Sequence, residues 1–250
     1  MLVPKYPIKS IYLSQLNKSQ LFQNLLGNDY LIAKYICIVN VHSTVTSDND
    51  PTLRNSINSA WLALADGKPL SVYANLMGCD PKLSRITGPE LMIDVLDISS
   101  EHNWRHYFYG STQSVLADLD RIMEQKYPDI NYRSYSPPFG NIDKHQIMAH
   151  IDNINSFSPH FIWIGLGAPK QEIFMLNYRQ HFKGGVLIGV GAGFDYLVGR
   201  ITRAPYIMQA LSLEWVFRLI QEPRRLWKRY LITNTRYILY TLTQMLRKFR

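Results

Sequence analysis

The sequence predicts an α/β fold, in which a mostly parallel sheet carries helices on both faces and is followed by a C-terminal helical appendage. Short apolar runs alternate with segments of helical spacing, and most of the runs end in small or polar residues. With 250 residues, 46% of them hydrophobic, the chain is long enough for one large domain plus an appendage. We expect an N-terminal extension over 1–30, an α/β domain over 31–202 and the appendage over 203–250.

Six apolar runs are short enough to be buried strands, and turn-forming or polar residues bound most of them. They lie at 34–39, 60–65, 106–109, 131–135, 160–164 and 185–190. Their alternation with helices is typical of a Rossmann-like sheet, because parallel strands need crossover connections that cover the faces of the sheet.

Capping residues mark several helix starts. Asp50 before Pro51 predicts a helix over 51–58, since an aspartate N-cap and a first-turn proline both favour a helix start. Thr87 with Glu90 three residues later matches a capping box for a helix that runs to about residue 96. Further helices are predicted over 112–126 and 141–156 and from residue 169, whereas residues 1–30 show no clear element.

Composition excludes several classes of protein. Ordinary hydrophobic and charged fractions exclude a disordered chain. Two cysteines, Cys37 and Cys79, are too few for a disulfide scaffold and favour a reducing compartment. The first residues lack the apolar run of a signal peptide, and no run of 18 apolar residues predicts a membrane-spanning helix.

The net charge of +8 is concentrated at the C-terminus. Residues 200–250 hold eleven lysines and arginines against two acids, a net charge of +9, whereas the first 199 residues carry a net charge of −1. Such a basic segment favours nucleic acid, anionic lipid or phosphorylated ligands, although a solvated basic face is the ordinary alternative.

Known catalytic and cofactor motifs are mostly missing. The sequence has no Walker A loop, no G-x-S-x-G elbow and no H-E-x-x-H pair, and its two glycine-rich turns lack the last glycine of the dinucleotide fingerprint. Asp48-Asn49-Asp50 matches the D-x-D of metal-using sugar transferases, but helix capping explains Asp50 and is the preferred interpretation. Small and polar residues nevertheless gather at strand ends, where α/β sheets bind ligands, although single glycines there serve equally well as turns.

Several stretches keep a common order and together resemble the WecG/TagA/CpsF family of bacterial glycosyltransferases. The resemblance covers about residues 35 to 231. It is carried by Asn40, 65–69 (ADGKP), 85–88 (RITG), 165–172 (GLGAPKQE), 189–195 (GVGAGFD), 203–205 (RAP) and 213–230 (LEWVFRLIQEPRRLWKRY).

The resemblance implies an inverting transferase that needs no metal and no cofactor. It implies a UDP-sugar donor carrying an N-acetylmannosamine-, uronic acid- or hexose-type sugar, and a lipid-diphosphate-linked saccharide as acceptor, in the synthesis of wall teichoic acid, enterobacterial common antigen, capsule or exopolysaccharide. We therefore expect a cytoplasmic protein that is peripheral on the inner face of the bacterial plasma membrane. Its other expected partner is an anionic membrane surface, without nucleic acid, and self-association into a homo-oligomer is left open.

Asp66 is the candidate catalytic base. It follows an apolar strand, and partial burial there would raise its pKa toward the working range of a base. An aspartate before glycine is also a common turn former, and the residues alone leave both readings open. The resemblance favours the base.

Candidate donor-binding residues lie at the other strand ends. The expected set is Asn40, Arg85, Thr87, Gly110, Gly167, Lys170, Gln171, Gly191 and Asp195. Several have structural alternatives: a salt bridge for Arg85, a cap for Thr87, solvation for Gln171 and Lys170, and loop bonds for Asn40 and Asp195. Many relatives carry threonine where this chain has Ile38, so the donor sugar could differ.

The appendage combines an apolar stripe with basic residues. Pro223 should end one helix and begin another, whose stripe comprises Trp227, Leu231, Ile238, Leu242, Met245 and Phe249. The pattern suits a helix lying in an anionic membrane interface, or one docked on the body or on another subunit by the same stripe. The resemblance implies that basic residues of this segment meet the diphosphate or the acceptor, and the candidates are Arg203, Arg218, Arg224, Arg225, Lys228 and Arg229.

Two other functions remain in view. Glycine turns after strands also suit an NAD(P)-dependent Rossmann oxidoreductase, and the basic tail suits a non-catalytic membrane adaptor. Neither accounts for the ordered set of motifs.

Overall fold

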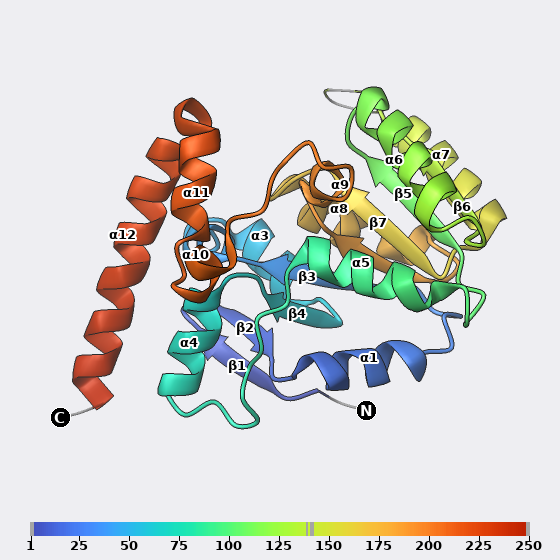
Figure 1. Cartoon of the computed structure of the whole chain (residues 1–250). Coiled ribbons are helices and arrows are strands. Elements are labelled where there is room, and N and C mark those ends of the chain that lie inside the picture. The colour runs from blue at the N-terminus through green and yellow to red at the C-terminus, as the bar shows by residue number, and fades with distance from the viewer. Residues whose placement is uncertain (1–2, 139, 141–142, 249–250) are drawn as a thin grey trace.

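The computed structural model describes residues 3–138, 140 and 143–248. Its centre is a six-stranded sheet in which every neighbouring pair of strands is parallel (Figure 1). The strand order is β4-β3-β8-β7-β5-β6. All six predicted strands are confirmed as β3 (Lys34–Val39), β4 (Leu62–Ala65), β5 (His106–Gly110), β6 (Tyr132–Tyr135), β7 (Phe161–Gly165) and β8 (Val186–Gly189).

Helices cover both faces of the sheet, as the sequence predicts (Figure 1). On one face, α1 (Lys18–Leu26), α5 (Gly88–Ser99), α6 (Gln113–Lys126) and α9 (Gly193–Leu197) pack against strand residues such as Ile36 and Trp163. On the other face lie α2 (Val41–Thr46), α3 (Pro51–Asn58), α4 (Lys68–Leu76), α7 (Lys144–Phe157) and α8 (Lys170–Tyr178). Successive strand side chains point to opposite faces, so apolar residues throughout each strand supply both cores.

The first thirty residues fold into elements that the sequence pattern does not reveal. A hairpin of β1 (Lys5–Ile8) and β2 (Ile11–Ser14) precedes α1, which Asn17 caps. Ile8, Ile11 and Leu13 are fully buried, and the Ser14 hydroxyl accepts a 3.0 Å hydrogen bond from the backbone N–H of Ala63 in β4. The hairpin therefore packs beside an outer strand of the sheet.

The predicted helix starts are confirmed where caps mark them. Asp50 caps α3 by accepting hydrogen bonds from the backbone N–H groups of Thr52 and Leu53, both at 3.0 Å, which supports capping over a metal-binding D-x-D. Thr87 caps α5. Helix α7 begins at Lys144, and residues 141 and 142 of the predicted helix lie outside the described part of the chain. A short 3₁₀ turn, Arg179–His181, follows α8.

The C-terminal segment contains α10 (Tyr206–Ala210), α11 (Glu214–Gln221) and α12 (Pro223–Lys248), and the predicted break at Pro223 is confirmed. Helix α12 runs along one side of the molecule beside α4 (Figure 1). It docks on the body, but not by the predicted stripe, because the buried residues are Leu226, Thr233 and Tyr237. Trp227, Leu231, Ile238 and Leu242 are about half exposed or more, Met245 packs partly on the body, and Phe249 lies outside the described residues.

Candidate active site

The predicted site residues of the body gather at the carboxyl edge of the parallel sheet. The chain leaves β5 toward β6 but leaves β7 in the opposite direction toward β8, so the connections diverge between β5 and β7. In α/β proteins ligands bind beyond the strand ends at such a point of divergence. A methyl group on Gly110, which has a φ of +124°, would lie 2.7 Å from the carbonyl carbon of Gly165, so the close pairing of β5 and β7 at this point requires glycine.

Asp66 lies immediately beyond β4, where its backbone N–H donates a 2.7 Å hydrogen bond to the carbonyl of Val39 in β3. The next residue, Gly67, has a φ of +99° and turns the chain into α4. Asp66 is half-buried as a residue. Burial and the carboxylates of Glu214 and Glu90 together outweigh the guanidiniums of Arg85 and Arg203, and the pKa of Asp66 rises to about 7.

Two arginines of the predicted site are held by acidic residues. The Nη2 of Arg85 donates hydrogen bonds to both carboxylate oxygens of Glu214, at 2.9 and 3.0 Å, and the Nη2 of Arg203 lies 2.9 Å from Oε1 of Glu90. Arg85 also lies 3.8 Å from Glu90. The salt-bridge interpretation of Arg85 is therefore correct for this structure, and its partner comes from α11 in the C-terminal segment.

Thr87 and Glu90 link this cluster to the start of α5. The Thr87 hydroxyl accepts a 3.4 Å hydrogen bond from the backbone N–H of Glu90 and donates one of 2.9 Å to the Glu90 carboxylate. Burial opposes ionisation of Glu90, but Thr87, Arg85 and Arg203 prevail and lower its pKa. The Glu90 carboxylate bonds the Thr87 hydroxyl and not the N-cap backbone, which differs from an ideal capping box.

Asn40 caps α2 from the end of β3. Its Oδ1 accepts hydrogen bonds from both the backbone N–H and the hydroxyl of Ser43, each at 3.0 Å. This local role matches the alternative of loop bonding. Ile38 lies in the buried layer between β3 and α5, so it places only apolar surface where a threonine hydroxyl would stand.

Gln171 is buried, which contradicts the alternative that water solvates it. Its Oε1 accepts a 2.9 Å hydrogen bond from the backbone N–H of Gly191, and its Nε2 donates to Glu172 at 3.0 Å. Lys170, one position earlier, is exposed. Gly167 and Gly191 have φ angles of +77° and +55°. Gln171 thus joins the turns that follow β7 and β8.

Arg218 brings the C-terminal segment over α9. Its Nη1 donates a 2.6 Å hydrogen bond to the Tyr196 hydroxyl, and its Nη2 donates a 2.8 Å bond to Glu222. Tyr196 follows Asp195, which is half-buried on α9. The end of β8 and helix α11 therefore meet through one guanidinium.

Arg229 belongs to α12, in the appendage, and lies where this helix packs against α2. Its Nε is buried and has no hydrogen-bond partner in the described part of the chain, and burial together with Arg225 and Arg218 lowers its pKa. Burial and Arg229 lower the pKa of His42, on α2, to about 4. The other predicted basic residues of this segment, Arg224, Arg225 and Lys228, are exposed, so the structure brings Arg218 and Arg229 toward the site and leaves these three at the surface.

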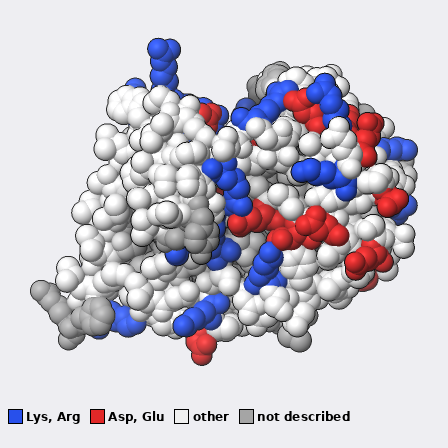
Figure 2. All heavy atoms as spheres, viewed as in Figure 1, with Lys and Arg blue, Asp and Glu red and all other residues white. Residues whose placement is uncertain are grey.

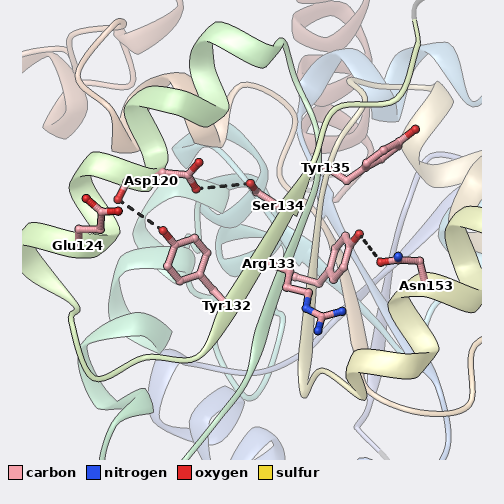
Figure 3. Close-up of a pocket in the computed structure, with 8 residues that line it drawn as sticks. Asp120, Glu124, Tyr132, Arg133, Ser134, Tyr135 and Asn153 are labelled. Carbon is pink, nitrogen blue, oxygen red and sulfur yellow. Dashed lines mark hydrogen bonds between the residues drawn. The ribbon is translucent and has the colours of Figure 1, made fainter.

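A separate hollow of about 520 Å³ lies along the outer strand β6. Figure 3 shows Tyr132 and Ser134 turned toward Asp120, with Arg133 and Asn153 on the opposite side of the strand. None of its lining residues belongs to the predicted site. Within the described ranges, no three His, Cys, Asp or Glu side chains gather as metal ligands.

Sequence reasoning did not assign functional roles to Glu90, Glu214, Tyr196 or His42. The sequence indicates only a capping role for Glu90, and Glu214 lies in a motif whose arginines are the more evident ligands for a diphosphate. Nothing in the sequence pairs Tyr196 with Arg218 or His42 with Arg229, since each contact joins distant segments.

The fold and the site define an α/β protein with a carboxylate set among arginines at the carboxyl edge of a parallel sheet. The sequence model of the family described as "Glycosyl transferase WecG/TagA/CpsF family" matches residues 6–250. The chain therefore belongs to this family of glycosyltransferases.

Two relatives carry the same name, N-acetylglucosaminyldiphosphoundecaprenol N-acetyl-β-D-mannosaminyltransferase. The protein of Bacillus spizizenii is 32% identical over 182 residues, which cover 73% of this chain and 68% of the relative. The protein of Staphylococcus aureus strain MW2 is 32% identical over 173 residues, which cover 69% of this chain and 65% of the relative. The matches thus span about two thirds of each relative.

Proposed function

We propose that the protein transfers a sugar from a UDP-sugar to a saccharide linked to a lipid diphosphate, with inversion at the anomeric carbon and without a bound metal. The observation that carries this proposal is the position of Asp66, a partly buried carboxylate with a pKa of about 7 at the carboxyl edge of the sheet. A base poised near neutral pH can accept the proton of an attacking hydroxyl. Neither the oxidoreductase nor the adaptor alternative receives comparable support.

The chemistry follows from one displacement. The acceptor hydroxyl oxygen forms a bond to the anomeric carbon, the bond from that carbon to the UDP oxygen breaks, and Asp66 takes the hydroxyl proton. Attack from the side opposite UDP inverts the configuration. The departing diphosphate gains negative charge, which nearby guanidiniums can stabilise because their forked N–H groups match phosphate oxygens.

We propose that side chains and turns at several strand ends bind different parts of the nucleotide-sugar donor. Asn40, Asp195 and the turns at Gly110, Gly167 and Gly191 line the edge on which the nucleotide-sugar would lie, with Thr87, Lys170 and Gln171 at the starts of α5 and α8. Arg85 and Arg203, then Arg218 and Arg229, are the cations for the diphosphate, with Arg224, Arg225 and Lys228 farther out. Arg85, Arg203 and Arg218 form ion pairs with glutamates in this structure. Binding of the diphosphate would have to weaken or replace these ion pairs.

The relatives' names support a narrower substrate class. Both relatives are named as N-acetylmannosaminyltransferases that act on N-acetylglucosaminyl-diphosphoundecaprenol. We propose an N-acetylhexosamine donor and a lipid-diphosphate-linked amino sugar acceptor, for a polymer of the bacterial cell envelope.

We also propose that the appendage rests on an anionic membrane surface at the cytoplasmic side. No helix within the described ranges is long and apolar enough to cross a membrane. Figure 2 shows that the outer surface of the C-terminal helices is largely uncharged on this face, whereas charged side chains gather over α5 and beside the appendage. Exposed apolar residues include Trp227, Leu231, Ile238 and Leu242, and exposed arginines include Arg224 and Arg236. This combination favours insertion into a lipid headgroup layer.

The test of the transfer activity uses the purified full chain, a panel of UDP-sugars that includes UDP-N-acetylmannosamine, and N-acetylglucosamine linked to a lipid diphosphate. Release of UDP that depends on the acceptor would support the proposal. Asp66→Asn should reduce turnover by at least about 100-fold and retain UDP binding, because general-base catalysis contributes about that much. Asp118→Asn, which removes a half-buried carboxylate on α6 that pairs with Arg121 and Arg200 away from the site, is the control. Undiminished turnover in Asp66→Asn would reject the base.

A further inference from the structure

Four charged side chains form an alternating chain beside Asp66. Glu214 accepts two hydrogen bonds from Arg85, Arg85 lies 3.8 Å from Glu90, and Glu90 accepts a 2.9 Å hydrogen bond from Arg203. Arg85 and Glu90 come from the body, in the loop before α5 and on α5, whereas Arg203 lies in the loop after α9, at the start of the appendage, and Glu214 lies on α11. The appendage therefore contributes both terminal members of a charge network that reaches the candidate base, and one of them, Glu214, depends on the docking of α11.

Arg85 is largely enclosed in this arrangement. Only 19% of its side-chain surface is exposed, and its Nε is buried without a hydrogen-bond partner among the described residues. A guanidinium in such a place needs a carboxylate, since an unpaired buried charge is strongly destabilising. Besides Glu214 and Glu90, the other carboxylate that feels the charge of Arg85 is that of Asp66.

We propose that Glu214 is a positioning residue for the transfer reaction: its carboxylate occupies Arg85 and thereby keeps this guanidinium from pairing with Asp66. The inference rests on the proposed role of Asp66 as the base. It makes the base depend on the docking of α11, because Glu214 reaches Arg85 only when that helix lies against the body.

The groups that act on Asp66 agree with this assignment. Glu214 from α11 and Glu90 from α5 raise the pKa of Asp66, whereas Arg85 and Arg203 lower it, and after burial Glu214 has the largest effect. Removing the Glu214 charge would remove one repulsion and release Arg85 at the same time. Both changes favour the ionised aspartate, which then has less affinity for the proton of the acceptor hydroxyl.

The primary test is a titration that needs no substrate. The pKa of Asp66 is measured by carboxyl-carbon NMR in the full chain, with its signal assigned by comparison with Asp66→Asn. In Glu214→Gln this pKa should fall by roughly one to two pH units, the range for a nearby opposite charge. In Glu214→Asp, which keeps the charge, the pKa of Asp66 should stay close to its raised value in the parent. In Asp118→Asn it should be unchanged. An unmoved pKa of Asp66 in a folded Glu214→Gln protein overturns the proposal.

A kinetic test separates positioning from mere docking. In Glu214→Gln the acid limb of the kcat/KM profile should move to lower pH by the same amount as the NMR titration, while the plateau falls several-fold. Loss of docking alone would lower kcat/KM without moving the limb. Should Glu214→Gln fail to fold, the titration is made on Glu214→Ala, which also removes the charge and should lower the pKa of Asp66 to a similar extent, and no shift there counts against the proposal. If Asp66→Asn retains full turnover, the base assignment fails, whereas the NMR titration still decides the coupling to Glu214.

Discussion

The side chain of Gln171 joins two strand ends: its Oε1 accepts a 2.9 Å hydrogen bond from the backbone N–H of Gly191, across the turns that follow β7 and β8. Its Nε2 is also paired, with Glu172 at 3.0 Å. Only 4% of Gln171 is exposed. One buried amide therefore joins the turns that follow β7 and β8, at the edge of the sheet where we place the nucleotide.

Replacing Gln171 with alanine should lower both stability and UDP affinity. The change leaves the backbone N–H of Gly191 unpaired and opens space beside Gly189, at a cost of about 1–3 kcal/mol. Urea unfolding measures the first effect and titration calorimetry with UDP the second. Lys170→Ala, an exposed change at the preceding position, should alter the free energy of unfolding by less than about 0.5 kcal/mol. Equal stabilities for the two variants would contradict the role given to Gln171.

Transfer should depend on pH through Asp66. Its pKa of about 7 means that the carboxylate, the form able to accept a proton, is the minor species below neutral pH. We expect kcat/KM to rise about tenfold per pH unit below pH 7 and to level off above it. A profile that is flat between pH 5 and pH 8 would be incompatible with this base. The Asp66→Asn protein should show no such limb in its residual activity.

The same carboxylate should reduce stability at high pH. Between about pH 4 and pH 7 the folded protein retains a proton at Asp66 that the unfolded chain has released, so the free energy of unfolding falls as pH rises through this window. Asparagine stays neutral. Asp66→Asn should therefore be more stable than the parent at pH 8, by at most about 4 kcal/mol, with the difference vanishing near pH 4. Unfolding curves for both proteins at pH 4, 6 and 8 test this, and a difference independent of pH would refute it.

The sequence predicts a helix or strand of this fold well where a short apolar run or a capping residue marks it. The strand predicted at 34–39 coincides with β3, and Asp50 and Thr87 cap the helices expected of them. The hairpin at the N-terminus has no such signal, because Ile8, Ile11 and Leu13 are buried by contacts with distant segments and do not follow one clear period. Tertiary packing supplies what the local pattern lacks.

At the candidate site, too, the sequence predicts positions that depend on strand ends but not the partners that depend on packing between distant segments. The sequence places Asp66 and Gly110 at the carboxyl edge of the sheet, where the structure also has them, because the ends of parallel strands lie together. It does not reveal that Glu214 pairs with Arg85 across 129 positions or that Gln171 is buried, since each depends on how α11 and α8 pack. A residue's type and motif indicate that it belongs to a site, whereas its partner depends on the fold.

The close approach of β5 and β7 should make Gly110 intolerant of any side chain. A Cβ there would lie 2.7 Å from Gly165, and the backbone φ of +124° adds strain. Gly110→Ala should therefore cost a few kcal/mol, since it combines strain with a clash. Gly199 has a φ of +75° with nothing within 4 Å of its ideal Cβ, so Gly199→Ala should cost only about 1 kcal/mol from strain. Similar losses for Gly110→Ala and Gly199→Ala in urea unfolding would contradict the close approach of β5 and β7 at Gly110.

Substitutions on the two faces of α12 should affect docking on the body and membrane binding separately. Tyr237 is 4% exposed and donates a 3.2 Å hydrogen bond to the Pro69 carbonyl, while the Tyr240 hydroxyl accepts a 3.2 Å bond from the backbone N–H of Lys9. Trp227, by contrast, is 49% exposed. Tyr237→Ala should loosen the helix by about 3 kcal/mol or more, the cost of removing a buried aromatic, and hydrogen exchange along α12 would report it.

Leu231→Asp should give the opposite result, with unchanged hydrogen exchange in α12 and weaker binding to vesicles that contain phosphatidylglycerol. The side chain is 64% exposed, so the folded protein loses little packing, whereas a membrane would have to accept a charge on its apolar contact face. Sedimentation with these vesicles, and with neutral phosphatidylcholine vesicles at high salt, measures the effect. If Leu231→Asp binds vesicles as tightly as the parent, the outer face of α12 does not meet the lipid, because an aspartate within that contact would oppose insertion and be repelled by the anionic surface.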